Sequence, residues 1–236
     1  MSDVSGIAGS TALPSGTVNE PQQVQRLPLE QRTAVSVTVL VALAGQAAIP
    51  QGFGLSPWWL LPGVAASLVL IIAAGGRWVE DPAHPGLRSL ALSLAAVLAL
   101  GNLLMVMMLV RAMLDGQPLQ AAGLFTVGAV VWVTNVVAFA VALWEIDAGG
   151  PVARTRVRLP EEGELLFPQY SLAGREQWSP RFSDYLYVSF TNATAFSPTD
   201  TLPLTVRVKL LMALQSAVAL VAVAVVFARG VNIIGA

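Results

Sequence analysis

Residues 210–228 read LLMALQSAVALVAVAVVFA, an apolar run without a single charged side chain. A helix needs about 20 apolar residues to cross a hydrocarbon core of about 30 Å, so this run predicts a transmembrane helix. Three longer uncharged stretches precede it, at 33–76, 89–110 and 116–144. The first is long enough for two helices, and each of the others for one. The sequence therefore predicts an all-α integral membrane protein with five transmembrane helices.

The composition of the whole chain agrees with this fold class and excludes several functions. Only 11% of its 236 residues are charged, against roughly 25% in soluble domains. There is no cysteine, which excludes disulfides and thiolate sites, and the single His84 and scattered acids predict no metal cluster. A net charge of −1 gives no reason to expect nucleic-acid binding. We expect no cofactor, and no enzyme, because no predicted span carries an ionisable residue and no nucleophile–base pair is evident.

Four regions follow from this pattern. Residues 1–32 form a polar tail that we expect to be disordered, and 33–147 form a four-helix membrane region, with spans at about 33–49, 58–74, 89–110 and 121–144. Residues 148–178 are polar and rich in Gly and Pro, and predict a solvated loop. Residues 179–236 hold a short helix, an irregular segment and the final span. We expect Glu145 and Asp147 to end the fourth span in solvent, and Asn102 and Asn135 to make interhelical hydrogen bonds rather than a functional site.

The short helix lies in residues 178–200, WSPRFSDYLYVSFTNATAFSPTD. Ser179 and Pro180 are typical of a helix start, and Pro198 should end the helix. Between them the apolar residues recur at helical spacing, at Phe182, Leu186, Phe190 and Ala193. Two placements stay open for a semi-apolar helix of this length. It either dips into the bilayer as a re-entrant helix or lies flat at the membrane interface.

A short helix, an irregular polar segment and then a full span is the order found in pore-loop ion channels. Irregular backbone at membrane depth is tolerated where it lines a water-filled cavity. The negative C-terminal dipole of a short helix favours a cation there, and oxygens beyond it replace the hydration of the ion. We predict an ion pathway with a narrow part and a wider part. The narrow part consists of Thr194, Ala195, Phe196, Ser197, Pro198, Thr199 and Asp200. The wider part consists of Gln215 and Ser216. Asp200 as a turn residue, and the last two as helix-packing residues, are the alternatives.

The segment Tyr187–Thr205, YVSFTNATAFSPTDTLPLT, resembles the pore region of two-span potassium channels, YFSFVTLTTLGYGDITPVT. The identical positions are Tyr187, Ser189, Phe190, Thr194, Asp200, Pro203 and Thr205. The resemblance implies a homotetramer that conducts monovalent cations, with the fourth and fifth spans as outer and inner helices. Both filter glycines are missing, since Ala195–Thr199 stands in place of TLGYG. A Cβ hinders the carbonyl orientations of the usual filter, so we expect a non-standard one.

The whole chain is also similar to an uncharacterised family of five-span bacterial membrane proteins. The motifs that carry this resemblance are Leu166-Phe167-Pro168, Asp184 to Thr191, Ser197 to Asp200, and Val231-Asn232-Ile233. It implies a multi-pass protein of the bacterial inner membrane. The functional alternative to a channel is a non-conducting scaffold or envelope-assembly protein.

The distribution of basic residues and the resemblance to potassium channels predict opposite orientations of the chain in the membrane. Eleven of the 13 Lys and Arg residues lie on the side of the N-terminus and the long loop, which the positive-inside rule assigns to the cytoplasm. Potassium-channel pore loops face outward.

Overall fold

The computed structural model describes residues 29–47, 63, 66, 67, 69, 70, 85–115, 121–174, 178–195 and 200–234. Its long helices are α1 (Leu29–Ala47), α3 (Pro85–Leu114), α4 (Ala121–Ile146) and α7 (Val206–Ile234), and a shorter helix, α6, covers Phe182–Ala195. Between α4 and α6 lie two 3-10 turns, η1 (Asp147–Gly149) and η2 (Pro168–Ser171), and the single-turn helix α5 (Pro151–Arg154). A two-residue strand, β1 (Leu165–Leu166), pairs antiparallel with β2 (Leu202–Pro203).

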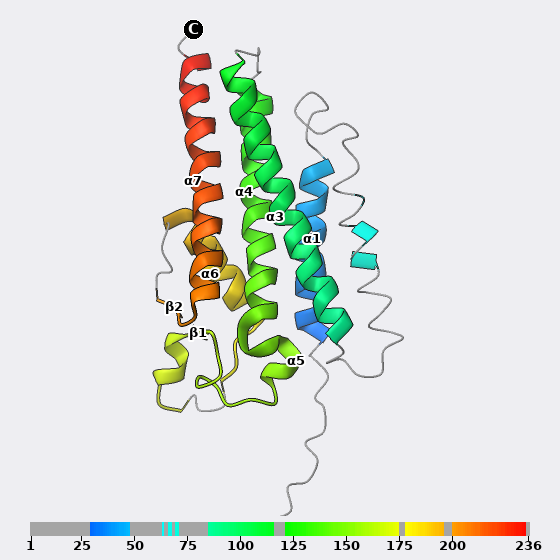
Figure 1. Cartoon of the computed structure of the whole chain (residues 1–236), viewed down its shortest axis with the longest axis vertical. Coiled ribbons are helices and arrows are strands. Elements are labelled where there is room, and N and C mark those ends of the chain that lie inside the picture. The colour runs from blue at the N-terminus through cyan, green and yellow to red at the C-terminus, as the bar shows by residue number, and fades with distance from the viewer. Residues whose placement is uncertain are drawn as a thin grey trace, which may run out of the picture.

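Three of the five predicted spans coincide with helices long and apolar enough to cross a membrane. These are the segments Pro85–Ala112, Ala122–Gly149 and Val206–Ala228. Figure 1 shows α3, α4 and α7 side by side as long, nearly parallel rods, with α1 next to α3. The chain is thus a helical, membrane-associated protein, and α4 runs antiparallel to α3 and α7.

The first two predicted spans are not among these three helices. The first, predicted at 33–49, lies in α1 up to Ala47, and this helix begins at Leu29, inside the predicted tail. Most of the second lies outside the described residues, as does the rest of the tail. In Figure 1, α1 and α3 run in the same direction, so the end of α1 and the start of α3 point toward opposite ends of the bundle. A second span between them remains a prediction.

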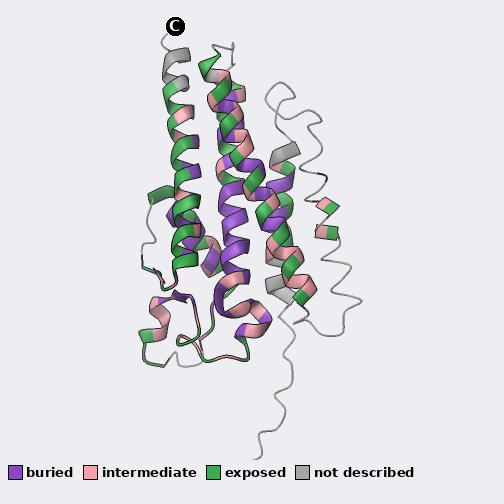
Figure 2. Ribbon diagram, in the orientation of Figure 1, coloured by how far each residue is buried: buried purple, intermediate pink, exposed green. Residues whose placement is uncertain are grey.

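Helix α4 is the centre of the bundle. Most of its span is buried inside the protein, whereas most residues of the α3 and α7 spans are partly or fully exposed, a contrast visible in Figure 2. The largest core cluster surrounds its second half and includes Leu98 of α3 and Phe182 of α6. The outer face of α7 is apolar and exposed at Leu210, Leu214 and Phe227, as expected for a helix that contacts lipid.

The predicted solvated loop, 148–178, is corrected by the structure. Thr155, Arg156 and Glu161 are exposed as predicted, but Leu165 and Phe167 belong to the core. The loop folds back under α4, α6 and α7 as a cap on one end of the bundle (Figure 1). Its polar composition misled the prediction because the buried charges are paired with one another, as described below.

Gly128 marks a close approach of α4 and α7. It is buried, and a Cβ at this position would overlap the Cγ2 atom of Val226. We expect Gly128→Ala to destabilise the protein by about 1–3 kcal/mol, because Val226 has a stiff β-branched side chain and the helices must move apart. The midpoint of thermal unfolding in detergent measures this loss of stability.

The second change Val226→Ala should recover most of the loss in the Gly128→Ala protein. If Gly128→Ala alone leaves the midpoint unchanged, the two helices are not in such close contact.

Candidate functional site

The site is organised around α6, which lies along α4 and not across it. The ring of Phe182, at the start of α6, packs against Trp144 with centroids 5.5 Å apart. The ring of Phe190 packs against Trp132 at 5.4 Å. These two partners on α4 are about three turns apart, roughly 18 Å at 1.5 Å per residue. Helix α6 therefore runs antiparallel to α4 for most of its own length.

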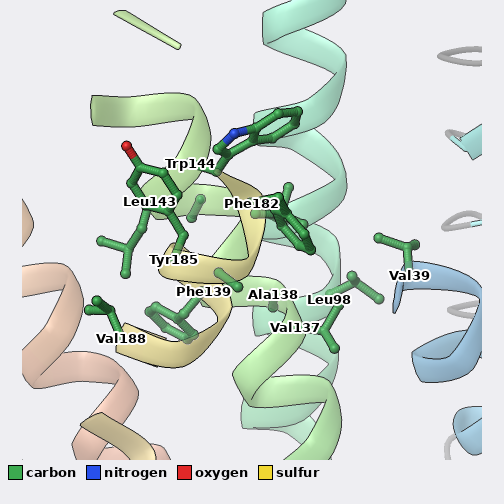
Figure 3. Packing of buried hydrophobic residues seen from close by; sticks show 14 of the residues in the cluster. Val39, Leu98, Val137, Ala138, Phe139, Leu143, Trp144, Phe182, Tyr185 and Val188 are labelled. Atoms are coloured by element: carbon green, nitrogen blue, oxygen red, sulfur yellow. The ribbon is translucent and has the colours of Figure 1, made fainter. Parts of the chain in front are cut away.

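Local sequence explains where α6 begins. The carboxylate of Asp184, in the first turn, accepts a hydrogen bond of 2.6 Å from the backbone N–H of Arg181, immediately before the helix. This is the reach-back half of a capping box. Helix α6 starts two residues after Pro180, slightly later than predicted. Figure 3 shows Phe182, Tyr185 and Val188 of α6 packed beside Phe139 and Leu143 of α4.

Buried polar side chains hold the second half of α6 at the middle of the α4 and α7 spans. The side-chain nitrogen of Gln215 on α7 donates to the Ser189 carbonyl at 2.9 Å and to its hydroxyl at 2.7 Å. The nitrogen of Asn192 donates to the Gln215 oxygen and to the Met212 carbonyl, both at 2.9 Å. The Ser189 hydroxyl donates to the Val136 carbonyl on α4 at 2.7 Å. Polar groups in a bilayer must be satisfied internally, so these bonds fix α6 between the two spans.

Two further bonds complete this group. The Asn135 side chain of α4 donates to the Gln215 carbonyl at 3.1 Å, and the Ser216 hydroxyl donates to the Asn192 carbonyl at 3.2 Å. We call the group, Asn135, Ser189, Asn192, Gln215 and Ser216, the amide cluster. The interhelical bond predicted for Asn135 is confirmed.

The predicted ion-pathway residues divide into three sets. Thr194 and Ala195 are exposed at the C-terminal end of α6, and Asp200 is exposed where the chain comes back to the cap. Residues 196–199 lie outside the described part of the chain. Gln215 is fully buried in the amide cluster and Ser216 is half-buried. The structure thus places the two α7 residues against Asn192 of α6, two residues before the exposed Thr194.

The segment after Asp200 is fastened to the cap. Leu165 of β1 pairs with Pro203 of β2, and the Leu204 N–H donates to the Glu164 carbonyl at 2.8 Å. Glu164 is buried, and its carboxylate accepts hydrogen bonds from Thr205 at 3.0 Å and from the Arg207 Nε at 2.5 Å. The same two charged side chains form an ion pair. One side chain of the cap therefore holds the first turn of α7.

The start of α6 is fastened to the cap through Asp147, which is 1% exposed. One carboxylate oxygen accepts the Glu164 and Leu165 N–H groups at 2.6 and 3.2 Å. The other accepts the Tyr185 hydroxyl of α6 at 2.5 Å. Asp147 thus connects the end of α4, the cap strand and α6.

Arg154 compensates the charge of Asp147 and caps α4. Its Nη2 donates to the carbonyls of Trp144 and Asp147 at 2.6 and 3.1 Å, and its Nε lies 3.6 Å from the Asp147 carboxylate. The guanidinium carbon also lies 4.8 Å from the centre of the Tyr185 ring. A cation at a helix C-terminus and over an aromatic face is stabilised twice. We call Asp147, Arg154, Glu164, Tyr185 and Arg207 the ionic cluster.

Aromatic packing supports the ionic cluster. Phe167 of the cap contacts the rings of Tyr170, Trp178 and Tyr185, with centroids 5.4–6.2 Å apart. Burial raises the pKa of the Tyr170 hydroxyl far above its ordinary value, so this side chain stays neutral. The start of α6 is therefore enclosed by the cap.

Sequence reasoning missed this cluster. Glu145 and Asp147 were predicted to be solvated, and both are buried. The Arg88 Nε donates to the Glu145 carbonyl at 3.1 Å, so this helix end is also covered. The only signal in the sequence was an acid and a base, Asp147 and Arg154, on either side of a Gly-Gly-Pro turn. Opposite charges around a turn are common in solvated loops, and the spacing does not distinguish the two cases.

In the described ranges, no group of three or more His, Asp or Glu side chains is placed to hold a metal ion. Compared with protein-family models, with curated proteins and with solved structures, the chain matches none.

Proposed function

We propose that this protein is a pore-loop ion channel that conducts monovalent cations as a homotetramer. One observation carries the proposal: α6 extends from the cap along α4 and ends beside the middle of the α7 span, with Thr194 and Ala195 exposed at its end. A helix that lay flat at the interface would not contact α4 over three turns. We assign α6 as a re-entrant helix in a five-span fold.

The chemistry of this helix end favours cations. The last carbonyls of a helix carry about half a negative charge together. The Thr194 hydroxyl donates to the Phe190 carbonyl at 2.8 Å, which leaves the lone pairs of its oxygen available to an ion. The carboxylate of Asp200 adds a full negative charge where the chain comes back to the cap. A single loop cannot surround an axial path, so several copies are required, and the resemblance to potassium channels favours four.

The buried position of Gln215 changes its assigned role. Its side chain is 0% exposed and both ends of its amide are hydrogen-bonded within the subunit. We therefore assign Gln215 to the positioning of α6, and not to the wider part of the pore. Ser216 is half-buried and remains a candidate for that part.

Flux through the purified protein in liposomes tests the proposal. We expect cation flux that falls several-fold in Asp200→Ala and changes in size or selectivity in Thr194→Ala. Because Asp200 is exposed, its effect should be larger at low ionic strength, where screening is weak. The matched control is Glu161→Ala, which removes an exposed acid from the cap and should leave flux unchanged.

A protein that is monomeric in the membrane and conducts no cations would overturn the proposal. That result would favour the scaffold or envelope-assembly role, for which no axial passage is needed.

A further inference from the structure

Lys209 lies on the lipid-facing side of α7. The side chain is exposed, as are those of Leu220 and Phe227, which are 51% and 65% exposed. With 3.6 residues per turn, these three positions fall within about 20° of one another around the helix axis. The neighbouring Leu210 is 66% exposed. Lys209 therefore stands at the cap end of an apolar strip that contacts lipid.

The chain that leads into α7 is also apolar and exposed. Leu202, Leu204 and Val206 are 56%, 46% and 71% exposed, and β2, which contains the first of them, is paired with the cap strand β1. Exposed apolar side chains that gather in one place mark surfaces that bind a membrane or a protein. This edge of the cap therefore lies against the bilayer.

The depth of Lys209 follows from its position in the span. The span Val206–Ala228 is centred on Ala217, eight residues beyond Lys209. Eight residues of helix rise about 12 Å, and half of the hydrocarbon core is about 15 Å thick. The backbone of Lys209 thus lies just inside the boundary between acyl chains and headgroups. Side chains on a helix lean toward its N-terminus, which for α7 is at the cap, so the ammonium group reaches the headgroup layer.

The charge of Lys209 is not compensated within the described part of the subunit. Arg207, two residues earlier, is paired with the buried Glu164. No ion pair among the described residues includes Lys209. Of the two cations in the first turn of α7, only the ammonium group of Lys209 is therefore available to an anion from outside the subunit.

We propose that Lys209 binds the phosphate of an anionic phospholipid in the leaflet on the cap side, with the acyl chains of that lipid along the exposed strip of α7. Phosphate is the anion that the bilayer supplies at this depth, and a lysine ammonium group binds it through a point charge and three N–H donors. A zwitterionic lipid carries its own cation, which competes for the phosphate, whereas an anionic lipid does not. The inference requires α7 to lie in a membrane and is independent of the proposed channel function.

The contact can be measured directly because Lys209 is the only lysine of the chain. Labelling with ¹⁵N-lysine therefore gives a single ammonium signal in solid-state NMR. In bilayers of phosphatidylglycerol and phosphatidylcholine, in a phosphate-free buffer, we expect a ¹⁵N–³¹P dipolar coupling of the size of a direct ammonium–phosphate contact. An ammonium signal without measurable coupling to phosphorus would overturn the proposal.

A ¹³C label in the headgroup of one lipid at a time identifies which lipid supplies the phosphate. With equal amounts of the two lipids, phosphatidylglycerol should be the neighbour of the ammonium group about five times as often as phosphatidylcholine, the preference that one basic residue near an anionic surface typically contributes. Equal occupancy by the two lipids would refute the assignment to an anionic lipid.

The matched control moves the only ammonium group two residues along the helix. Lys209→Gln combined with Arg207→Lys places it beside the Glu164 carboxylate, which pairs with residue 207. The coupling to phosphorus should fall several-fold, because the carboxylate competes with the phosphate. A folded double variant with undiminished coupling would show that the contact does not depend on the uncompensated charge of Lys209, contrary to the proposal.

Discussion

Replacing Asp147 with alanine should destabilise the protein by about 3–5 kcal/mol, the cost of leaving one partner of a buried ion pair uncompensated. Asp147 is 1% exposed and accepts three hydrogen bonds, from Glu164, Leu165 and Tyr185. Its loss leaves the Arg154 charge without its ion-pair partner and two buried backbone N–H groups without an acceptor. The apparent melting midpoint in detergent should fall by the order of 10 °C.

Two companion variants show whether burial causes the effect. Asp115→Asn removes an acid from an exposed ion pair with Arg111 at 3.6 Å, and should shift stability by less than about 0.5 kcal/mol. The pair of changes D147N and R154M removes both buried charges, and should recover part of the loss seen in Asp147→Asn alone. An Asp147→Ala protein that melts like its parent would mean that this carboxylate is solvated after all.

The second large effect is expected for Gln215→Leu, which removes two hydrogen bonds to Ser189 and one from Asn192. Interhelical hydrogen bonds in membranes contribute about 0.6 kcal/mol on average and up to about 1.7 kcal/mol. The change should therefore cost about 2–3 kcal/mol and release the second half of α6 from α7. Because the chain has no cysteine, a single Thr194→Cys reports on this region, and its rate of thiol labelling should rise several-fold in Gln215→Leu.

The control is Leu214→Ala, one residue earlier on the exposed face of α7. This change removes apolar surface but no hydrogen bond, and should leave the labelling rate at residue 194 unchanged. If Gln215→Leu also leaves the rate unchanged, the amide cluster does not fix the end of α6.

The long helices were predictable because the membrane imposes a simple rule on sequence. A run without charge, about 20 residues long, has few alternatives to a transmembrane helix. The predicted spans at 89–110, 121–144 and 210–228 lie inside α3, α4 and α7 with boundaries a few residues short. They are short because a helix continues past the apolar core until its end is capped, as Arg154 caps α4.

The candidate site was predictable only in part. Helical periodicity from Phe182 to Ala193 gave α6 correctly, but no local pattern shows which element a helix packs against. The amide cluster and the ionic cluster join residues far apart in the chain. Their members are Asn, Ser, Gln, Asp and Arg, which in sequence are equally typical of solvent-facing positions. Only the packing of α4 against α6 and α7 distinguishes Gln215 as a buried anchor from Gln215 as a pore-lining residue.

The bond between Asn135 and Gln215 joins residues 80 positions apart, and this separation has a consequence for biosynthesis. A ribosome adds about 5–20 residues per second, so Asn135 is made about 4–16 s before Gln215. During that interval the Asn135 amide belongs to a newly inserted helix whose final neighbour does not yet exist. The nascent protein must therefore keep α4 shielded, by the translocon or by α3, until translation of the last span allows the bundle to close.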